Sequence, residues 1–256
     1  MNQRKSLKEL NLLDKFLFDE AMDDPENVKT MLDIILSQNT NLKHPPQTEK
    51  EQRTATDNRQ IRLDVYAIDE DDVIYEVEAQ KENTHNLLKR SRLYQGIIDS
   101  KLLPPGVVDF NLLNEVLIVM ITPFDLFGYG LYRYTFQMRC EEVPELKLDD
   151  GATRIFLNTR GKHPELVSSE LIELLKYMEH STDEVSEACE SKRIQEMHRR
   201  VCRIKASEKT EVKYMQAWEE KLLERQKEKR ELLRKMNHKM SIEKIADVLD
   251  MDVSEV

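Results

Sequence analysis

The chain of 256 residues contains few cysteine, glycine, proline and tryptophan residues, with 3, 6, 8 and 1 of them respectively. Cys140, Cys189 and Cys202 are few and far apart, which excludes a disulfide framework or a zinc motif and is typical of a reducing cytosol. No apolar run approaches the roughly 18 residues of a membrane-spanning helix, so we expect no membrane segment. The basic N-terminus lacks the apolar core of a secretory signal. These absences predict a cytoplasmic protein.

Common enzyme motifs are also absent. The sequence has no HExxH, GxSxG, P-loop or GxGxxG pattern, so the corresponding protease, hydrolase and nucleotide-binding functions lack support. A net charge of −10 counts at first sight against nucleic acid as a partner. However, residues 190–244 hold 17 Lys and Arg against 10 Glu, a balance of +7, so the rest of the chain carries −17. An acidic domain can still bind DNA where metal ions neutralise part of its site.

Two strand-like segments around an acidic turn are the most informative part of the sequence. Apolar and polar residues alternate from Ile61 to Ala67 and again from Val73 to Gln80. This period of two is typical of half-buried strands. The link Asp69–Asp72 has the composition of a turn, so the two segments are predicted to form a β-hairpin.

The hairpin is expected to bring three polar side chains to one face. Opposed residues of an antiparallel pair have numbers with a constant sum, and a sum of 142 places Asp64 opposite Glu78, whereas 140 places it opposite Glu76. In both registers Asp64, Glu78 and Gln80 share a face. Opposed Cα atoms lie roughly 4.5–5.5 Å apart, so two carboxylates can bind one divalent ion there. A solvated acidic face is the simpler interpretation, but opposed like charges destabilise a sheet unless they are compensated.

The pattern resembles the PD-(D/E)XK nuclease superfamily, in which an acid on one strand precedes an acid-x-Lys triplet on the next. Here the triplet is Glu78-Ala79-Gln80, with Gln in place of Lys. The D…ExQ form is more similar to the recombination-promoting nuclease (Rpn-like) and putative transposase family. The segments that also look like this family are Leu10–Leu36, Leu87–Leu103, Ile121–Val143, Asp150–Lys162 and Leu174–Glu184.

The resemblance covers about residues 7–182 and implies an α/β fold with a restriction-endonuclease-like core, a mixed sheet flanked by helices. It implies a metal-dependent DNA endonuclease that promotes recombination. Asp64 and Glu78 would each give an oxygen to Mg²⁺ or Mn²⁺, the carbonyl of Ala79 would be a further ligand, and Gln80 would orient the attacking water. Because Gln80 lacks the charge of Lys, we predict modest activity or dependence on a second ion.

Other residues are weaker candidates. In this superfamily an acid of the first helix sometimes joins the metal site, and the acids of the opening helix are Asp14, Asp19 and Glu20. The basic residues that follow the strands and could hold phosphates are Lys89, Arg90 and Arg92. Solvated positions on an amphipathic helix are the simpler interpretation of these three. Tyr94 could pack beside the site. His198 and Cys202 have a helical spacing that a metal could bridge, but two ligands without a third indicate coincidence.

The sequence divides into three parts. Residues 1–182 form the predicted nuclease-like domain. Residues 183–240 are dense in Glu, Lys and Arg, so we predict one or two long, exposed helices there. A helix this polar rarely stands alone, which favours a coiled-coil or partner-binding arm that forms homo-oligomers. Residues 241–256 resemble half of a helix-turn-helix, and a small docking helix is favoured over DNA recognition by this segment.

Two functions are compatible with these features of the sequence. The first is a metal-dependent DNA endonuclease. The alternative is a nuclease-fold protein with weak or no activity that binds DNA or assembles through its C-terminal helices. A DDE-type transposase is disfavoured because its three acids would be spread widely along the chain, whereas Asp64 and Glu78 belong to consecutive strands.

Overall fold

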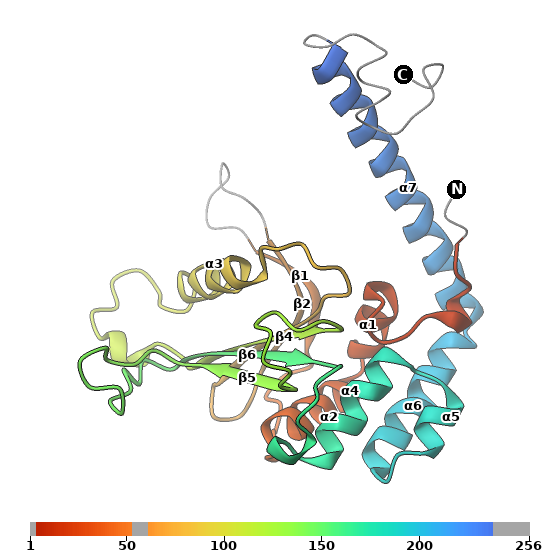
Figure 1. The fold of residues 1–256 in the computed structure, drawn as a ribbon. Helices are drawn as coiled ribbons and strands as arrows, with labels where there is room; N and C mark the ends of the chain where they lie inside the picture. The colour runs from red at the N-terminus through yellow and green to blue at the C-terminus, as the bar shows by residue number, and fades with distance from the viewer. Residues whose placement is uncertain (1–3, 53–60, 238–256) are drawn as a thin grey trace. The chain divides into compact units, whose positions relative to one another are not determined.

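The computed structural model describes residues 4–52 and 61–237, and it is an α/β fold with a six-stranded mixed sheet flanked by helices (Figure 1). The expected fold class is confirmed at this level. One compact unit extends from Ser6 to Lys205, and the described residues outside it form a second unit, which is treated separately.

The six strands form one sheet in the order β1-β2-β3-β4-β6-β5. Their bounds are β1 Gln47–Gln52, β2 Ile61–Ile68, β3 Ile74–Ala79, β4 Val116–Thr122, β5 Arg133–Phe136 and β6 Ala152–Asn158. β2 is antiparallel to both β1 and β3, whereas β3, β4 and β6 run parallel, and β5 is an antiparallel edge strand. Strand β1 lies in the polar stretch that precedes the hairpin.

The predicted hairpin is confirmed, in the register with a sum of 142. Ile68 pairs with Ile74. The turn forms because Asp69 binds its own loop: Oδ1 accepts from the amides of Asp71 and Val73, at 3.0 and 2.9 Å. Its other oxygen accepts from the hydroxyl of Tyr75 at 2.6 Å. An aspartate that satisfies the amides of the next few residues is a common device in turns.

Helices of the compact unit flank this sheet, and α7 belongs to the second unit. The α-helices are α1 Lys15–Met22, α2 Pro25–Leu36, α3 Leu87–Asp99, α4 Ser169–Glu179, α5 Asp183–Glu187, α6 Lys192–Lys205 and α7 Glu208–Asn237, and the short 3₁₀ helices are η1 Leu7–Glu9, η2 Phe110–Leu112 and η3 Pro164–Leu166. Helix α2 begins as its sequence predicts, because the Asp24 side chain accepts from the Glu26 amide and Pro25 follows at the first helical position. Among the described helices, none has the length and apolar character needed to cross a membrane.

One face of the sheet packs against α3. The parallel register of β3 and β4 pairs Glu76 with Ile118 and Glu78 with Met120, so these four side chains share a face of the sheet. The core on this side combines residues of the sheet with residues of α3, namely Tyr66, Ile74, Tyr94, Ile97, Ile98, Val116, Ile118, Met120, Tyr134 and Phe156. The acidic residues of β3 therefore project into a buried layer rather than into solvent.

The compact unit ends after Lys205, whereas the change in composition along the sequence predicts a boundary after residue 182. Helices α5 and α6 pack with α1, α2 and α4. Although α6 is highly charged, Ile194, Met197 and Val201 are spaced along one side of it and are fully buried. Helix α7 matches the expected long charged helix, with Leu222 and Leu223 exposed. The helix-turn expected at 241–256 lies outside the described residues.

This division predicts how truncated chains behave. A chain that ends at Lys205 should unfold cooperatively, whereas a chain that ends at Asp183 should lose at least about 4 kcal/mol, because it lacks three buried apolar side chains of α6. Thermal denaturation followed by circular dichroism measures the difference. Equal melting temperatures for the two chains would contradict the assignment of α6 to the core. Light scattering of the Lys205 chain beside the full chain tests whether α7 drives association.

Candidate active site

Three acidic side chains meet on the β2–β3 hairpin. Asp64 and Glu78 are each 5% exposed, and Glu76 is completely buried. The register continues from the Val65–Val77 pair, so Asp64 faces the end of β3, where Glu78 lies. Burial of this many carboxyl groups is costly unless cations or hydrogen bonds compensate them.

Arg90 of α3 lies against the end of β3. Its Nη2 donates to Oε1 of Glu78 and, at 2.7 Å, to Oε1 of Gln80. The hydroxyl of Tyr94 lies near Glu78 and lowers the pKa of its carboxyl group, against the larger effect of burial, which raises it. The amide nitrogen of Gln80 donates to the carbonyl of Glu82 at 2.7 Å. Gln80 thus lies beside Glu78, as the hairpin predicts, and both ends of its amide are engaged.

Lys15 of α1 lies on the other side of the cluster. Its ammonium is 2.6 Å from Oδ1 of Asp64, 3.0 Å from Oδ2 of Asp19 and 3.8 Å from Oε1 of Glu49. Burial raises the pKa of the Asp64 carboxyl group, whereas Lys15 and the nearby backbone of Ala79 lower it. The convergence of three carboxylates on one ammonium marks a position that is favourable for a cation.

The opening-helix acids have different positions. Asp19 joins the cluster through Lys15. Asp14 pairs with Lys81 and accepts from the amide of Asn11 at 2.9 Å, and Glu20 is the next residue after Asp19 and is half-buried. Of the three acids, Asp19 is the one that shares a cation with Asp64.

Burial raises the pKa values of the acids in this cluster, which contains more carboxyl groups than cations. Desolvation, followed by the charge of Asp64, raises the pKa of Glu78 to about 7. Desolvation likewise raises the pKa of Asp19 to about 7 and that of Asp64 above its ordinary value. Glu76, with Glu78 as its largest charged neighbour, has a pKa well above the usual range. Glu49 is paired with Arg62 at 3.2 Å, so the other four carboxyl groups, Asp19, Asp64, Glu76 and Glu78, face two cations, Lys15 and Arg90. The cluster would carry a net charge of −2 if all four were ionised.

Three buried oxygens of this cluster have no hydrogen-bond partner: both carboxyl oxygens of Glu76 and Oε2 of Glu78. A buried carboxyl oxygen without a partner costs free energy. Mg²⁺ and Mn²⁺ prefer carboxylate oxygen ligands, and a divalent cation supplies the two missing positive charges. The donor type of these residues therefore suits such an ion, although the carboxylate oxygens of Asp64, Glu76 and Glu78 do not all lie within 4.8 Å of one another.

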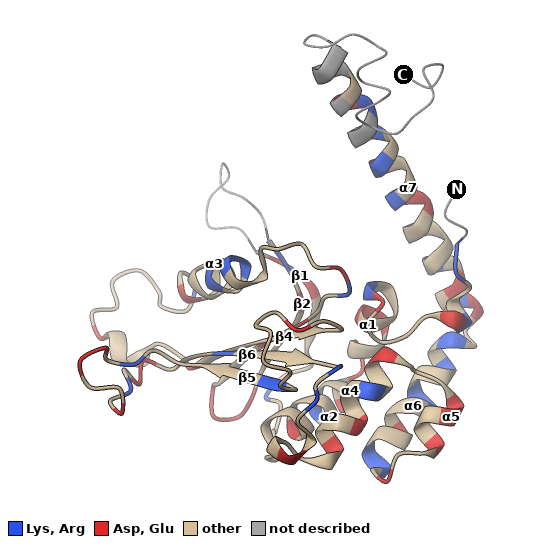
Figure 2. Cartoon of the chain, in the orientation of Figure 1, with Lys and Arg blue, Asp and Glu red and all other residues tan. Residues whose placement is uncertain are grey.

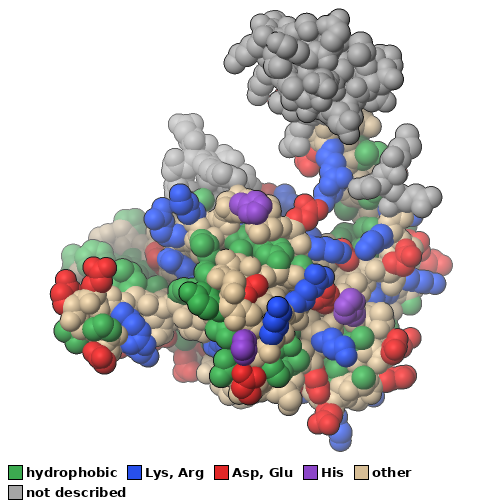
Figure 3. All heavy atoms as spheres, in the orientation of Figure 1, with side chains coloured by type: hydrophobic (Ala, Val, Ile, Leu, Met, Phe, Trp, Pro, Cys, Tyr) green, Lys and Arg blue, Asp and Glu red, His purple; other side chains and the backbone are tan. Residues whose placement is uncertain are grey.

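Basic side chains lie close to this site. Lys89 and Arg92 are exposed on α3, and Lys81 follows β3 directly. Lys and Arg colour much of α3 in the cartoon, and basic side chains gather near α3 in the space-filling view (Figures 2 and 3). A local basic surface can hold phosphates even in an acidic protein.

Sequence reasoning did not single out Lys15 or Glu76. Glu76 could have been found, because it alternates with Glu78 on the same face of β3. Lys15 gave no comparable signal, since its pairing with Asp64 joins residues 49 positions apart. The four-residue spacing from Lys15 to Asp19 is common on any charged helix.

Comparison with known proteins adds no assignment: no protein-family model matches the chain, and no match is found among curated proteins. Function is therefore argued from the residues of the site and their contacts.

Proposed function

We propose that the protein is a metal-dependent DNA endonuclease with a PD-(D/E)XK core. The observation that supports this most is the cluster of four carboxyl groups around Lys15 and Arg90, with three buried oxygens lacking a hydrogen-bond partner. Structural ion pairs normally match acids with cations, whereas this cluster is two positive charges short. Such a deficit is typical of a site for a divalent cation.

The arrangement of elements is compatible with this proposal. The acid Asp64 lies on β2, and the Glu78-Ala79-Gln80 triplet ends the adjacent antiparallel strand β3. Helix α3 follows and connects β3 to the parallel strand β4. Helix α1 precedes the sheet and carries Asp19, one of the three candidate acids of the opening helix, beside Lys15.

Asp64 and Glu78 would hold the ion, with Asp19 or Glu76 as a further carboxylate. The ion, when bound, would lower the pKa of the attacking water and stabilise negative charge on the phosphate. Arg90 is anchored to the oxygen of Gln80 and contributes the fixed positive charge that the glutamine itself lacks. The exposed Lys89 and Arg92 would position the DNA backbone.

The second candidate is a nuclease-fold protein with weak or no activity that acts as a DNA-binding or oligomeric assembly module. One observation favours it: Asp64 and Glu78 each have a cation already, Lys15 and Arg90 respectively. If these ion pairs persist in the presence of Mg²⁺, the cluster is a structural feature and the protein would bind DNA without cutting it.

A plasmid-nicking assay separates the two candidates. The full chain should convert supercoiled plasmid to the nicked form in Mg²⁺ or Mn²⁺, and EDTA should abolish the reaction. The activity should coincide with the 30.2 kDa chain across a final gel-filtration column. A gel-shift with the same DNA but no nicking in either metal would reject the endonuclease and leave the binding module.

A further inference from the structure

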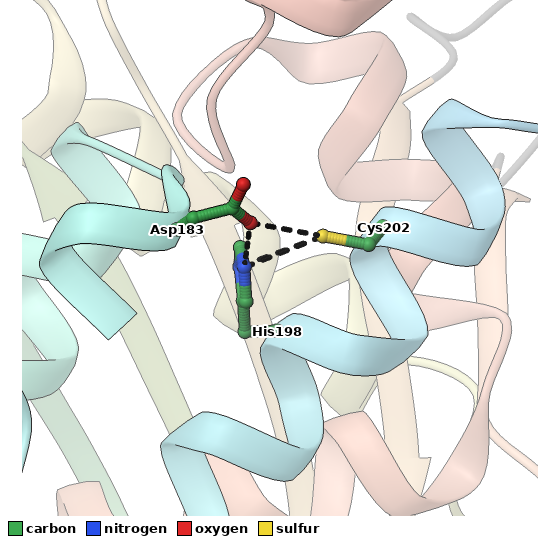
Figure 4. Close-up of side chains that lie close together, drawn as sticks. All are labelled: Asp183, His198 and Cys202. Carbon is green, nitrogen blue, oxygen red and sulfur yellow. Dashed lines mark hydrogen bonds and ion pairs between the residues drawn. The ribbon is translucent and has the colours of Figure 1, made fainter. Parts of the chain in front are cut away.

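Three metal-ligating side chains meet where helices α5 and α6 pack together (Figure 4). Asp183 is the first residue of α5, whose start is fixed by Thr182 accepting from the amide of Val185. His198 and Cys202 lie one turn apart on α6. Their spacing is visible in the sequence, and Asp183, 15 residues before His198, supplies the third group that the sequence interpretation lacked.

The three ligand atoms converge on one point. Nε2 of His198 lies 2.7 Å from Oδ1 of Asp183 and 3.3 Å from Sγ of Cys202, and Sγ lies 3.8 Å from Oδ1. In a tetrahedral site with metal–ligand bonds of about 2.0–2.3 Å, ligand atoms are roughly 3.3–3.6 Å apart. The two sulfur separations agree with that range to about 0.2 Å. The 2.7 Å separation is a hydrogen bond, whose proton a metal ion would replace.

The second ring nitrogen of His198 contacts the hydroxyl of Tyr177. Its Nδ1 lies 2.9 Å from the hydroxyl of Tyr177, and the two rings are nearly perpendicular, with an interplanar angle of 88°. Tyr177 is fully buried, so it fixes the orientation of the imidazole and directs Nε2 at the other two groups. A hydrogen bond to the remote nitrogen is the usual support of a metal-binding histidine.

A nucleophilic Cys–His–Asp relay does not fit this geometry. Such a relay uses one ring nitrogen for the thiol and the other for the acid. Here Asp183 and Cys202 share Nε2 of His198. Burial and the charge of Asp183 also raise the pKa of the Cys202 thiol, which is opposite to what an activated nucleophile needs.

We propose that Asp183, His198 and Cys202 bind one Zn²⁺ ion, with a water in the fourth position. Thiolate and imidazole ligands select Zn²⁺ over Mg²⁺, so this site differs in chemistry from the carboxylate cluster. The Asp183 side chain is 84% exposed and that of His198 11%, so the ion would enter from the Asp183 side. On binding, the Cys202 thiol would lose its proton to solvent, and His198 would bind the ion through Nε2 as neutral imidazole, with its ring proton on Nδ1 facing the Tyr177 hydroxyl. The ion would then tie α5 to α6.

Titration of the metal-free full chain with Co²⁺, followed by Zn²⁺, tests this site independently of nuclease activity. One equivalent of Co²⁺ should produce a thiolate-to-cobalt charge-transfer band, which Zn²⁺ should remove, and Zn²⁺ should raise the melting temperature. Cys202→Ser should abolish the band. Asp183→Asn, at an exposed position that leaves the core intact, should weaken binding at least about tenfold.

Matched controls locate the metal. Cys140→Ser and Glu184→Gln change a thiol and an acid outside the cluster, and both should keep the band and its affinity. Asp64→Asn should keep them as well, since it belongs to the carboxylate cluster. The proposal is overturned if the wild-type chain gives no band, if Cys202→Ser keeps it, or if Asp183→Asn binds Co²⁺ as tightly as the wild type.

Discussion

Asp64→Asn and Glu78→Gln are each expected to lower the rate of Mg²⁺-dependent plasmid nicking by at least about 10²-fold. Each substitution keeps the shape of the side chain and removes one negative charge from the deepest part of the cluster. Lys15 and Arg90 would remain, so the residual charge would no longer favour a divalent cation. Initial rates of nicking at saturating Mg²⁺ measure the effect.

We expect these two variants to be folded, so that their lower nicking rates result from the change in the cluster. Burial raises the pKa of Glu78 to about 7, so the folded protein accommodates its neutral form, which Gln mimics. Glu70→Gln is the matched control, because Glu70 is an exposed acid in the turn of the same hairpin. It should nick at the wild-type rate. Wild-type rates in Asp64→Asn and Glu78→Gln would reject the metal-centred mechanism, and a cooperative melting transition in each variant would confirm that all of them are folded.

The parts of the fold that the sequence predicted are those set by local patterns. Alternation from Ile61 to Ala67 and from Val73 to Gln80 defined both strands, and the self-capping Asp69 explains why the acidic link turns between them. The Asp24-Pro25 pair likewise marked the start of α2, because an N-cap and a proline at the first helical position act within a single turn.

The parts that the sequence did not predict depend on contacts between distant elements. The ion pair of Lys15 with Asp64 joins α1 to β2, and the bond of Arg90 to Gln80 joins α3 to the end of β3. Neither follows from periodicity or charge spacing. The packing of α6 could not be predicted from composition either. Three apolar residues determine which side of this helix is buried, and they stand among many charged residues.

In the absence of divalent ions, the free energy of unfolding is expected to fall as the pH rises from about 4.5 to 7.5. Glu78 has a folded pKa of about 7 against an ordinary value of 4.5, so the folded state binds more protons than the unfolded state in this window. The stability that this group contributes is therefore fully present below its unfolded pKa and is lost as the pH passes its folded pKa. Its share is about 3 kcal/mol. Asp19, whose pKa is also raised to about 7, acts in the same direction.

The difference between wild type and Glu78→Gln isolates the contribution of Glu78 and its coupled neighbours, because titrating groups distant from the cluster contribute equally to both proteins. Urea unfolding at several pH values in EDTA should show a steeper fall for the wild type than for Glu78→Gln, with Glu70→Gln following the wild type. Mg²⁺ should stabilise the wild type more at pH 8 than at pH 5, since the ion binds the ionised carboxylates and competes with protons. Parallel pH curves for wild type and Glu78→Gln would show that burial does not raise the pKa of Glu78, and would contradict this prediction.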